Sequence, residues 1–152
     1  MEYTISSQLL WLSFTSLALL YGLMLVGIYI TASHQGLSCP SWPLCPNGFN
    51  LPLPKYFFEQ IHRIIALITA AVIIITAFYA TKTIKEVRKT SGIAAALVLA
   101  QVLLGKFVVD SKLEPLLVAT HLSTGVLLFA MTLLTFLYCY RTINTKSFEN
   151  RE

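Results

Sequence analysis

Charged side chains are scarce in this sequence. Only 12% of the 152 residues are Asp, Glu, Lys or Arg, whereas 56% are hydrophobic. A shortage of charge on this scale excludes an ordinary soluble domain and is typical of a membrane protein. Four apolar runs reach the roughly 20 residues that a helix needs to cross a hydrocarbon core. Because these runs occupy most of the chain, we predict a single membrane domain over residues 1–152.

The sequence also lacks a basic surface of the kind that binds nucleic acid. Its net charge is +4, but the Lys and Arg residues are not gathered on one face interleaved with aromatic residues. They lie beside the apolar runs, and positive residues in such positions are retained in the cytoplasm. This rule assigns to the inner side Lys82, Lys85, Arg88, Lys89, Arg141, Lys146 and Arg151. We therefore expect both termini in the cytoplasm.

A basic leader is missing in front of the first apolar run, which is also longer than the core of a signal peptide. We expect this run to be a retained helix. The whole pattern predicts an all-α antiparallel bundle of four transmembrane helices, over about residues 8–31, 59–82, 91–109 and 116–141. Pro115 suits the first position of the fourth helix, where a missing N–H costs nothing. A cytoplasmic loop is expected over residues 83–90, and a frayed polar tail after Arg141.

The longest connection is an outer loop over residues 32–58. Its prolines forbid a regular helix through much of it; they are Pro40, Pro43, Pro46, Pro52 and Pro54. Loops longer than about 12–15 residues are usually functional or disordered, and aromatic residues such as Trp42, Phe49 and Tyr56 argue against disorder. We expect the loop to lie at the membrane surface as a lid.

Two of the three histidines are expected at the same depth. His62 follows Pro54 by about eight residues and His121 follows Pro115 by about six, so both lie roughly 10 Å from the starts of two parallel helices. Two imidazoles so placed can supply both axial positions of a haem. Each could instead be a buried polar residue bonded to a neighbour. A structural zinc site is less favoured because it normally needs four N or S ligands. His34 is expected to be a solvated loop residue.

Glu59 precedes His62 by three residues and therefore shares its helix face. A carboxylate at a helix start is stabilised by exposed N–H groups, and beside a bound ligand it could act as a general base. Alternatively, it is an ordinary helix-start residue paired with Arg63. Arg63 itself could hold a haem propionate, because its guanidinium suits bidentate carboxylate binding.

Cys39 and Cys45 lie in the segment expected to face an oxidising compartment, where disulfides persist. A bridge between them would close a small ring and stiffen the lid. Both a structural and a redox-active disulfide remain open, since strained exposed disulfides are the labile ones. Cys139, near the inner end of the fourth helix, is expected to be a small packing residue.

These motifs resemble haem A synthase, a membrane enzyme family that makes haem A from haem O. The resemblance lies in the segment Gly36-Leu-Ser-Cys-Pro-Ser-Trp-Pro-Leu-Cys45, in Glu59-x-x-His62-Arg63, in residues 101–109 and in His121. It implies that Cys39 and Cys45 are the loop pair, that Glu59 is the active-site carboxylate, and that His62 and His121 are the haem-associated histidines. Thr31 to Gln35 departs from the Thr-Gly-Ser-like stretch usual in the family.

The resemblance further implies oxidation of the C8 methyl of haem O to a formyl group, for assembly of a terminal oxidase in a prokaryotic plasma membrane. The usual family members have eight helices in two homologous halves, so this chain corresponds to one half, and a homo-oligomer is implied. A quinone or another acceptor would take the electrons, and a second haem b could be involved. Two rivals stay open: a b-type haem-binding or oxidase-assembly protein, and a membrane thiol–quinone oxidoreductase that uses the Cys pair.

Overall fold

The computed structural model describes residues 7–46, 48, 50 and 54–149. This part of the chain forms four long helices and no strands: α1 (Ser7–Ala32), α2 (Phe57–Ala80), α3 (Lys85–Asp110) and α4 (Pro115–Glu149). A short 3₁₀ helix, η1 (Pro54–Tyr56), leads into α2. Each of the four is long and apolar enough to cross a membrane. The predicted all-α, four-helix membrane fold is therefore confirmed.

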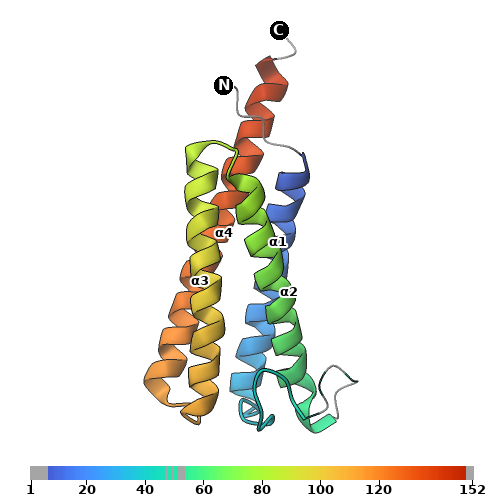
Figure 1. Cartoon of the computed structure of the whole chain (residues 1–152), viewed down its shortest axis with the longest axis vertical. Coiled ribbons are helices and arrows are strands. Elements are labelled where there is room, and N and C mark those ends of the chain that lie inside the picture. Colours follow the sequence, from blue (N-terminus) through green and yellow to red (C-terminus); the bar gives the residue numbers. More distant parts are fainter. Residues whose placement is uncertain (1–6, 47, 49, 51–53, 150–152) are drawn as a thin grey trace.

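The helices run antiparallel in an up-and-down bundle (Figure 1). α1 packs against α2 and α4, and α3 packs against the same two helices. Consequently α2 and α4 occupy opposite corners of the bundle and run in the same direction. The start of α1 and the end of α4 lie at one end, here called the terminal end, whereas the segment between α1 and α2 lies at the other, the loop end (Figure 1).

Large apolar side chains face outward along the bundle, as lipid contact requires. Trp11, Phe78 and Leu116 are 66%, 74% and 71% exposed, although such side chains would be buried in a soluble protein. Inside the bundle, an apolar core at mid-depth consists of Leu20, Ala70, Ile73, Ala94, Val98 and Leu128. The bundle is thus apolar on its outer face and at mid-depth inside, which fits a membrane protein.

Between this core and the terminal end lies a layer of buried hydroxyl groups from all four helices. Its members are Ser13, Ser16, Thr76, Ser91, Thr132 and Thr135. They line a cavity of about 10 Å³, which is about the room that one water molecule needs. Ser16 and Thr76 are hydrogen-bonded across helices at 3.1 Å. Hydroxyl pairs of this kind join helices in lipid, where the hydrophobic effect does not.

Three helices have boundaries that differ from expectation by two residues or more. α3 begins at Lys85 rather than near residue 91, because Lys, Glu and Arg are good helix formers; the charges mark the membrane boundary but do not end the helix. α4 continues to Glu149 rather than ending near Arg141, since neither Gly nor Pro interrupts this stretch. α2 spans Phe57–Ala80 instead of 59–82. Phe49, Pro52 and Arg151 lie outside the described residues.

Candidate functional site

The first turn of α2 presents Glu59 to the loop above it. The side chain is buried, with the residue 5% exposed. One carboxylate oxygen, Oε2, accepts hydrogen bonds from Ser38 Oγ at 2.8 Å and from the backbone N–H of Cys39 at 2.9 Å. The other, Oε1, lies 2.6 Å from Nη2 of Arg63. Since a carboxylate has about four acceptor positions, Glu59 has about one left.

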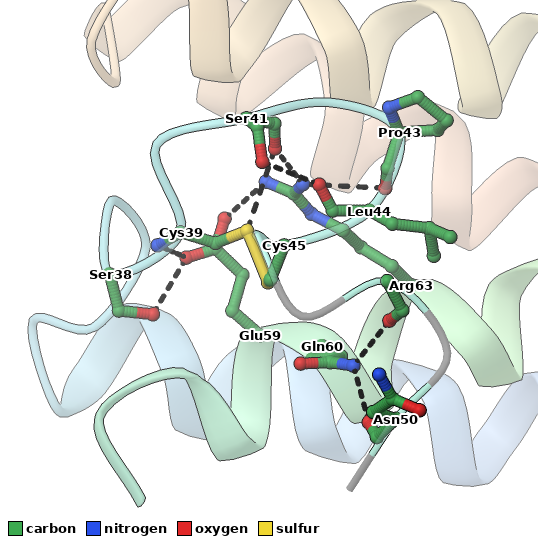
Figure 2. Close-up of a disulfide and its surroundings, with 11 residues drawn as sticks. Ser38, Cys39, Ser41, Pro43, Leu44, Cys45, Asn50, Glu59, Gln60 and Arg63 are labelled. Carbon is green, nitrogen blue, oxygen red and sulfur yellow. Dashed lines mark hydrogen bonds and ion pairs between the residues drawn. A yellow bond between two sulfur atoms is a disulfide. The ribbon is translucent and has the colours of Figure 1, made fainter. Parts of the chain in front are cut away.

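Arg63 follows one turn later and turns its guanidinium towards the same loop (Figure 2). Besides pairing with Glu59, its Nη1 donates to the carbonyl oxygens of Ser41 and, at 3.3 Å, of Pro43. The ion pair that the sequence left open as an alternative is therefore present. Together, these three hydrogen bonds leave Arg63 with its Nε–H and one Nη2–H for any further acceptor.

Gln60, which the sequence analysis did not single out, is a third anchor for the loop. It is fully buried, and its Nε2 donates to the carbonyl oxygens of Gly48 at 2.7 Å and Asn50 at 3.1 Å (Figure 2). Its Oε1 is buried without a partner among the described residues. A polar residue in the first helical turn after a long loop is the signal that could have identified it. Glu59, Gln60 and Arg63 together hold the loop to the start of α2.

Cys39 and Cys45 form a disulfide with their Cα atoms 5.2 Å apart, as predicted, and both residues are buried. The ring that they close contains the Ser41 and Pro43 carbonyls to which Arg63 donates (Figure 2). The disulfide therefore stabilises the same turn of the loop that the Glu59–Arg63 pair binds.

His62 lies on α2, five residues after Phe57, and faces Gly27 of α1. A Cβ placed on Gly27 would lie 3.0 Å from Cε1 of His62. His121 lies on α4, six residues after Pro115, and faces Gly105 of α3, where a Cβ would lie 3.6 Å from Cε1 of His121. Each imidazole thus rests on a helical glycine of the preceding helix, at nearly equal depth below the loop end.

The two imidazoles are carried by helices that occupy opposite corners of the bundle. The Nδ1 atoms of both are buried without a hydrogen-bond partner in the described part of the chain. Gln101 supports the second histidine, because its Nε2 donates to the backbone carbonyl of His121 at 3.0 Å. Gly125, one turn further along α4, lies beside the Gln101 side chain, where a Cβ would be 3.9 Å from both Oε1 and Nε2.

The donor set at this depth fits a haem. Among the described side chains, which end at residue 144, no three His, Cys, Asp or Glu residues are grouped as a metal site needs. A haem brings its own four nitrogen donors and takes only one or two from the protein. A neutral imidazole offers one ring nitrogen as an acceptor for iron. The two histidines would therefore be the residues that hold it.

The remaining candidate functional residues lie away from this site. His34 is exposed in the loop. Cys139 is a free thiol, buried at the terminal end against Leu9, Ala80 and Val87, where it packs as expected. Lys106 pairs with Asp110 on the exposed side of α3.

Known proteins resemble this chain over most of its length. The model of the cytochrome oxidase assembly protein family, COX15-CtaA, matches residues 50–152. A haem A synthase from Shewanella oneidensis is 30% identical over 149 residues, which cover 86% of this chain and 45% of that protein. A haem A synthase from Staphylococcus epidermidis is 32% identical over 140 residues, covering 85% of this chain and 46% of that protein.

A further relative is protohaem IX farnesyltransferase 1 from Natronomonas pharaonis, 31% identical over 112 residues, which cover 73% of this chain and 24% of that protein. The chain spans less than half the length of these relatives. The family match includes Glu59, His62, Arg63 and His121 and covers more than half of the chain. The chain therefore belongs to the cytochrome oxidase assembly protein family COX15-CtaA.

Proposed function

We propose that this chain is a haem A synthase, which oxidises the C8 methyl group of haem O to a formyl group. The observation that carries the proposal is the pair formed by His62 and His121. Their Nδ1 atoms are buried and unpartnered in the described part of the chain, and they lie at nearly equal depth on helices that run in the same direction. Such a pair suits haem ligation.

The reaction converts a methyl group and one water molecule into a formyl group, four protons and four electrons. It proceeds by two hydroxylations, each removing two electrons, and the resulting geminal diol loses water. An acceptor of the quinone class takes the electrons. The residues of this chain hold the porphyrin, exclude bulk water and receive protons.

Glu59 is the proposed proton acceptor near the methyl group. Its carboxylate accepts hydrogen bonds from Ser38, Cys39 and Arg63, and about one acceptor position remains for a proton. Arg63 would hold a haem propionate through the N–H groups that the loop does not use.

We propose a prokaryotic plasma-membrane location with the loop end outside and the terminal end in the cytoplasm. The basic residues around the α2–α3 turn support this orientation, since Lys82, Lys85, Arg88 and Lys89 all belong to the terminal end. We also propose a homo-oligomer.

The test is pigment extraction after co-expression of the chain with a haem O synthase in cells that lack their own haem A synthase. Haem A should appear with the wild-type chain. With Glu59→Ala the protein should keep its haem, and haem A should be missing. Haem bound by the wild-type chain without any haem A would reject the enzyme and favour a b-type haem-binding or oxidase-assembly protein.

A thiol–quinone oxidoreductase is the second candidate, and the Cys39–Cys45 disulfide is the observation in its favour. Replacing both cysteines with serine separates the two functions. Under the haem A synthase proposal, the double variant still binds haem and makes a reduced amount of haem A. If the double variant binds haem but loses all oxidoreductase activity, the thiol oxidoreductase is favoured.

A further inference from the structure

We infer that Gly27 is a positioning residue, a seat on α1 that sets how closely the His62 imidazole approaches that helix and hence where His62 meets a bound haem. The inference rests on the proposed haem-binding role of His62. It concerns a residue on another helix that supplies no donor atom of its own.

The seat is defined by one close approach. A Cβ on Gly27 would lie 3.0 Å from Cε1, 3.6 Å from Nδ1 and 3.9 Å from Nε2 of His62. All three ring atoms thus lie within 4 Å of the position that a methyl group would occupy. The first distance is shorter than carbon atoms normally tolerate, since optimal carbon–carbon separations are about 3.5–4.0 Å. A methyl group at residue 27 would force the imidazole away from α1 by a few tenths of an ångström.

The backbone that carries His62 has little freedom to move away from α1. His62 is carried by α2, which packs along α1, and its χ1 is confined to staggered positions. The first turn of the same helix is held to the loop by Glu59, Gln60 and Arg63. A methyl group at residue 27 would therefore displace the imidazole ring and not the helix that carries it. The Nδ1 of this ring is one of the two unpartnered nitrogens.

Other glycines of the bundle provide internal comparisons. Gly22 lies on the same helix, and a Cβ there would meet nothing within 4 Å. Gly105 faces His121, but the corresponding distance of 3.6 Å is an ordinary contact. The tight seat is thus a property of the His62 side. Alanine is a better helix former than glycine, so a harmful effect of Gly27→Ala would oppose the general trend.

The experiment titrates the purified, haem-free chain in detergent with haemin and records the Soret band and the low-spin electron paramagnetic resonance spectrum. Gly27→Ala should bind haemin about tenfold more weakly than the wild type, as overpacking a closely packed site typically does, and should shift the low-spin g-values. Gly22→Ala should match the wild type in both measurements.

Thermal unfolding of the haem-free variants gives a second test. Gly27→Ala should lower the melting temperature when His62 is present, and should leave it unchanged or raise it in a His62→Ala background, where the methyl group has room. Melting temperatures lowered equally in both backgrounds would overturn the seat. This comparison holds even if the single variant is too unstable to titrate.

Two outcomes separate the inference from the proposed function. If His62→Ala loses haemin binding while Gly27→Ala binds as the wild type does, the seat is rejected and the haem site stands. If His62→Ala binds haemin normally, the assignment of His62 as a ligand is rejected, and the seat as a device for positioning the haem is rejected with it.

Discussion

Replacing Glu59 with glutamine tests how strongly the start of α2 holds the loop. The carboxylate accepts three hydrogen bonds, from Ser38, Cys39 and Arg63. Glutamine has nearly the same shape but offers one acceptor oxygen and one donor NH₂ group. In either orientation the NH₂ group faces a donor, either Nη2 of Arg63 or the two donors of the loop. Glutamine therefore loses the hydrogen bonds that one of the two carboxylate oxygens accepts in the wild type.

The expected magnitude follows from these contacts. A hydrogen bond to a charged group contributes about 1.5–3 kcal/mol. A buried group that is left without its partner also destabilises the closed loop, because its lost hydration is not replaced. Glu59 is 5% exposed, so water compensates little. We expect the loop to open about 2 kcal/mol more easily, which corresponds to a roughly 30-fold rise in the open population.

Hydrogen exchange at the backbone amide of Cys39 measures this opening, because that N–H donates to Glu59. The chain would be studied in lipid nanodiscs, and Glu59→Gln should exchange roughly 30 times faster there than the wild type. Asp110→Asn is the matched control, since Asp110 also forms an ion pair four residues along a helix but is half exposed, where such pairs contribute about 0–1 kcal/mol. Unchanged protection in Glu59→Gln would refute the anchor.

Two other predictions concern the disulfide and the hydroxyl layer. Replacing Cys39 and Cys45 with serine should loosen the loop by up to about 2 kcal/mol, the entropic effect of a short closed ring, and should leave the haem content unchanged; loss of haem would contradict this. A double-mutant cycle with Ser16→Ala and Thr76→Val, read by unfolding in detergent, should give a coupling of about 0.6 kcal/mol, typical of hydrogen bonds between membrane helices. No coupling would mean that the bond does not join α1 to α2.

The sequence predicts the bundle well because long apolar runs leave few alternatives. Pro115 opens α4 as its missing N–H suggests. The predicted start of α3, near residue 91, is too late, because the charged residues at 85–89 have the hydropathy of a loop although they are favourable in a helix. Hydropathy locates the membrane boundary, and helix propensity decides where the helix ends.

Contacts with backbone atoms are beyond what the sequence predicts. The spacing of Glu59 and Arg63 suggests an ion pair but does not reveal that the carbonyls of Ser41 and Pro43 complete it. Gln60 went unnoticed for the same reason, since its partners are also loop carbonyls. The approach of His62 to Gly27 depends on the register between α1 and α2, which a periodic apolar pattern leaves undetermined.

The central claim is that His62 and His121 together hold a haem. The most direct measurement is the haem content and reduced-minus-oxidised spectrum of the purified wild type, His62→Ala and His121→Ala, each prepared from the same haem-replete cells. The wild type should show a low-spin haem spectrum, and each substitution should abolish it. Haem content and a low-spin spectrum that remain unchanged in both variants would contradict the account.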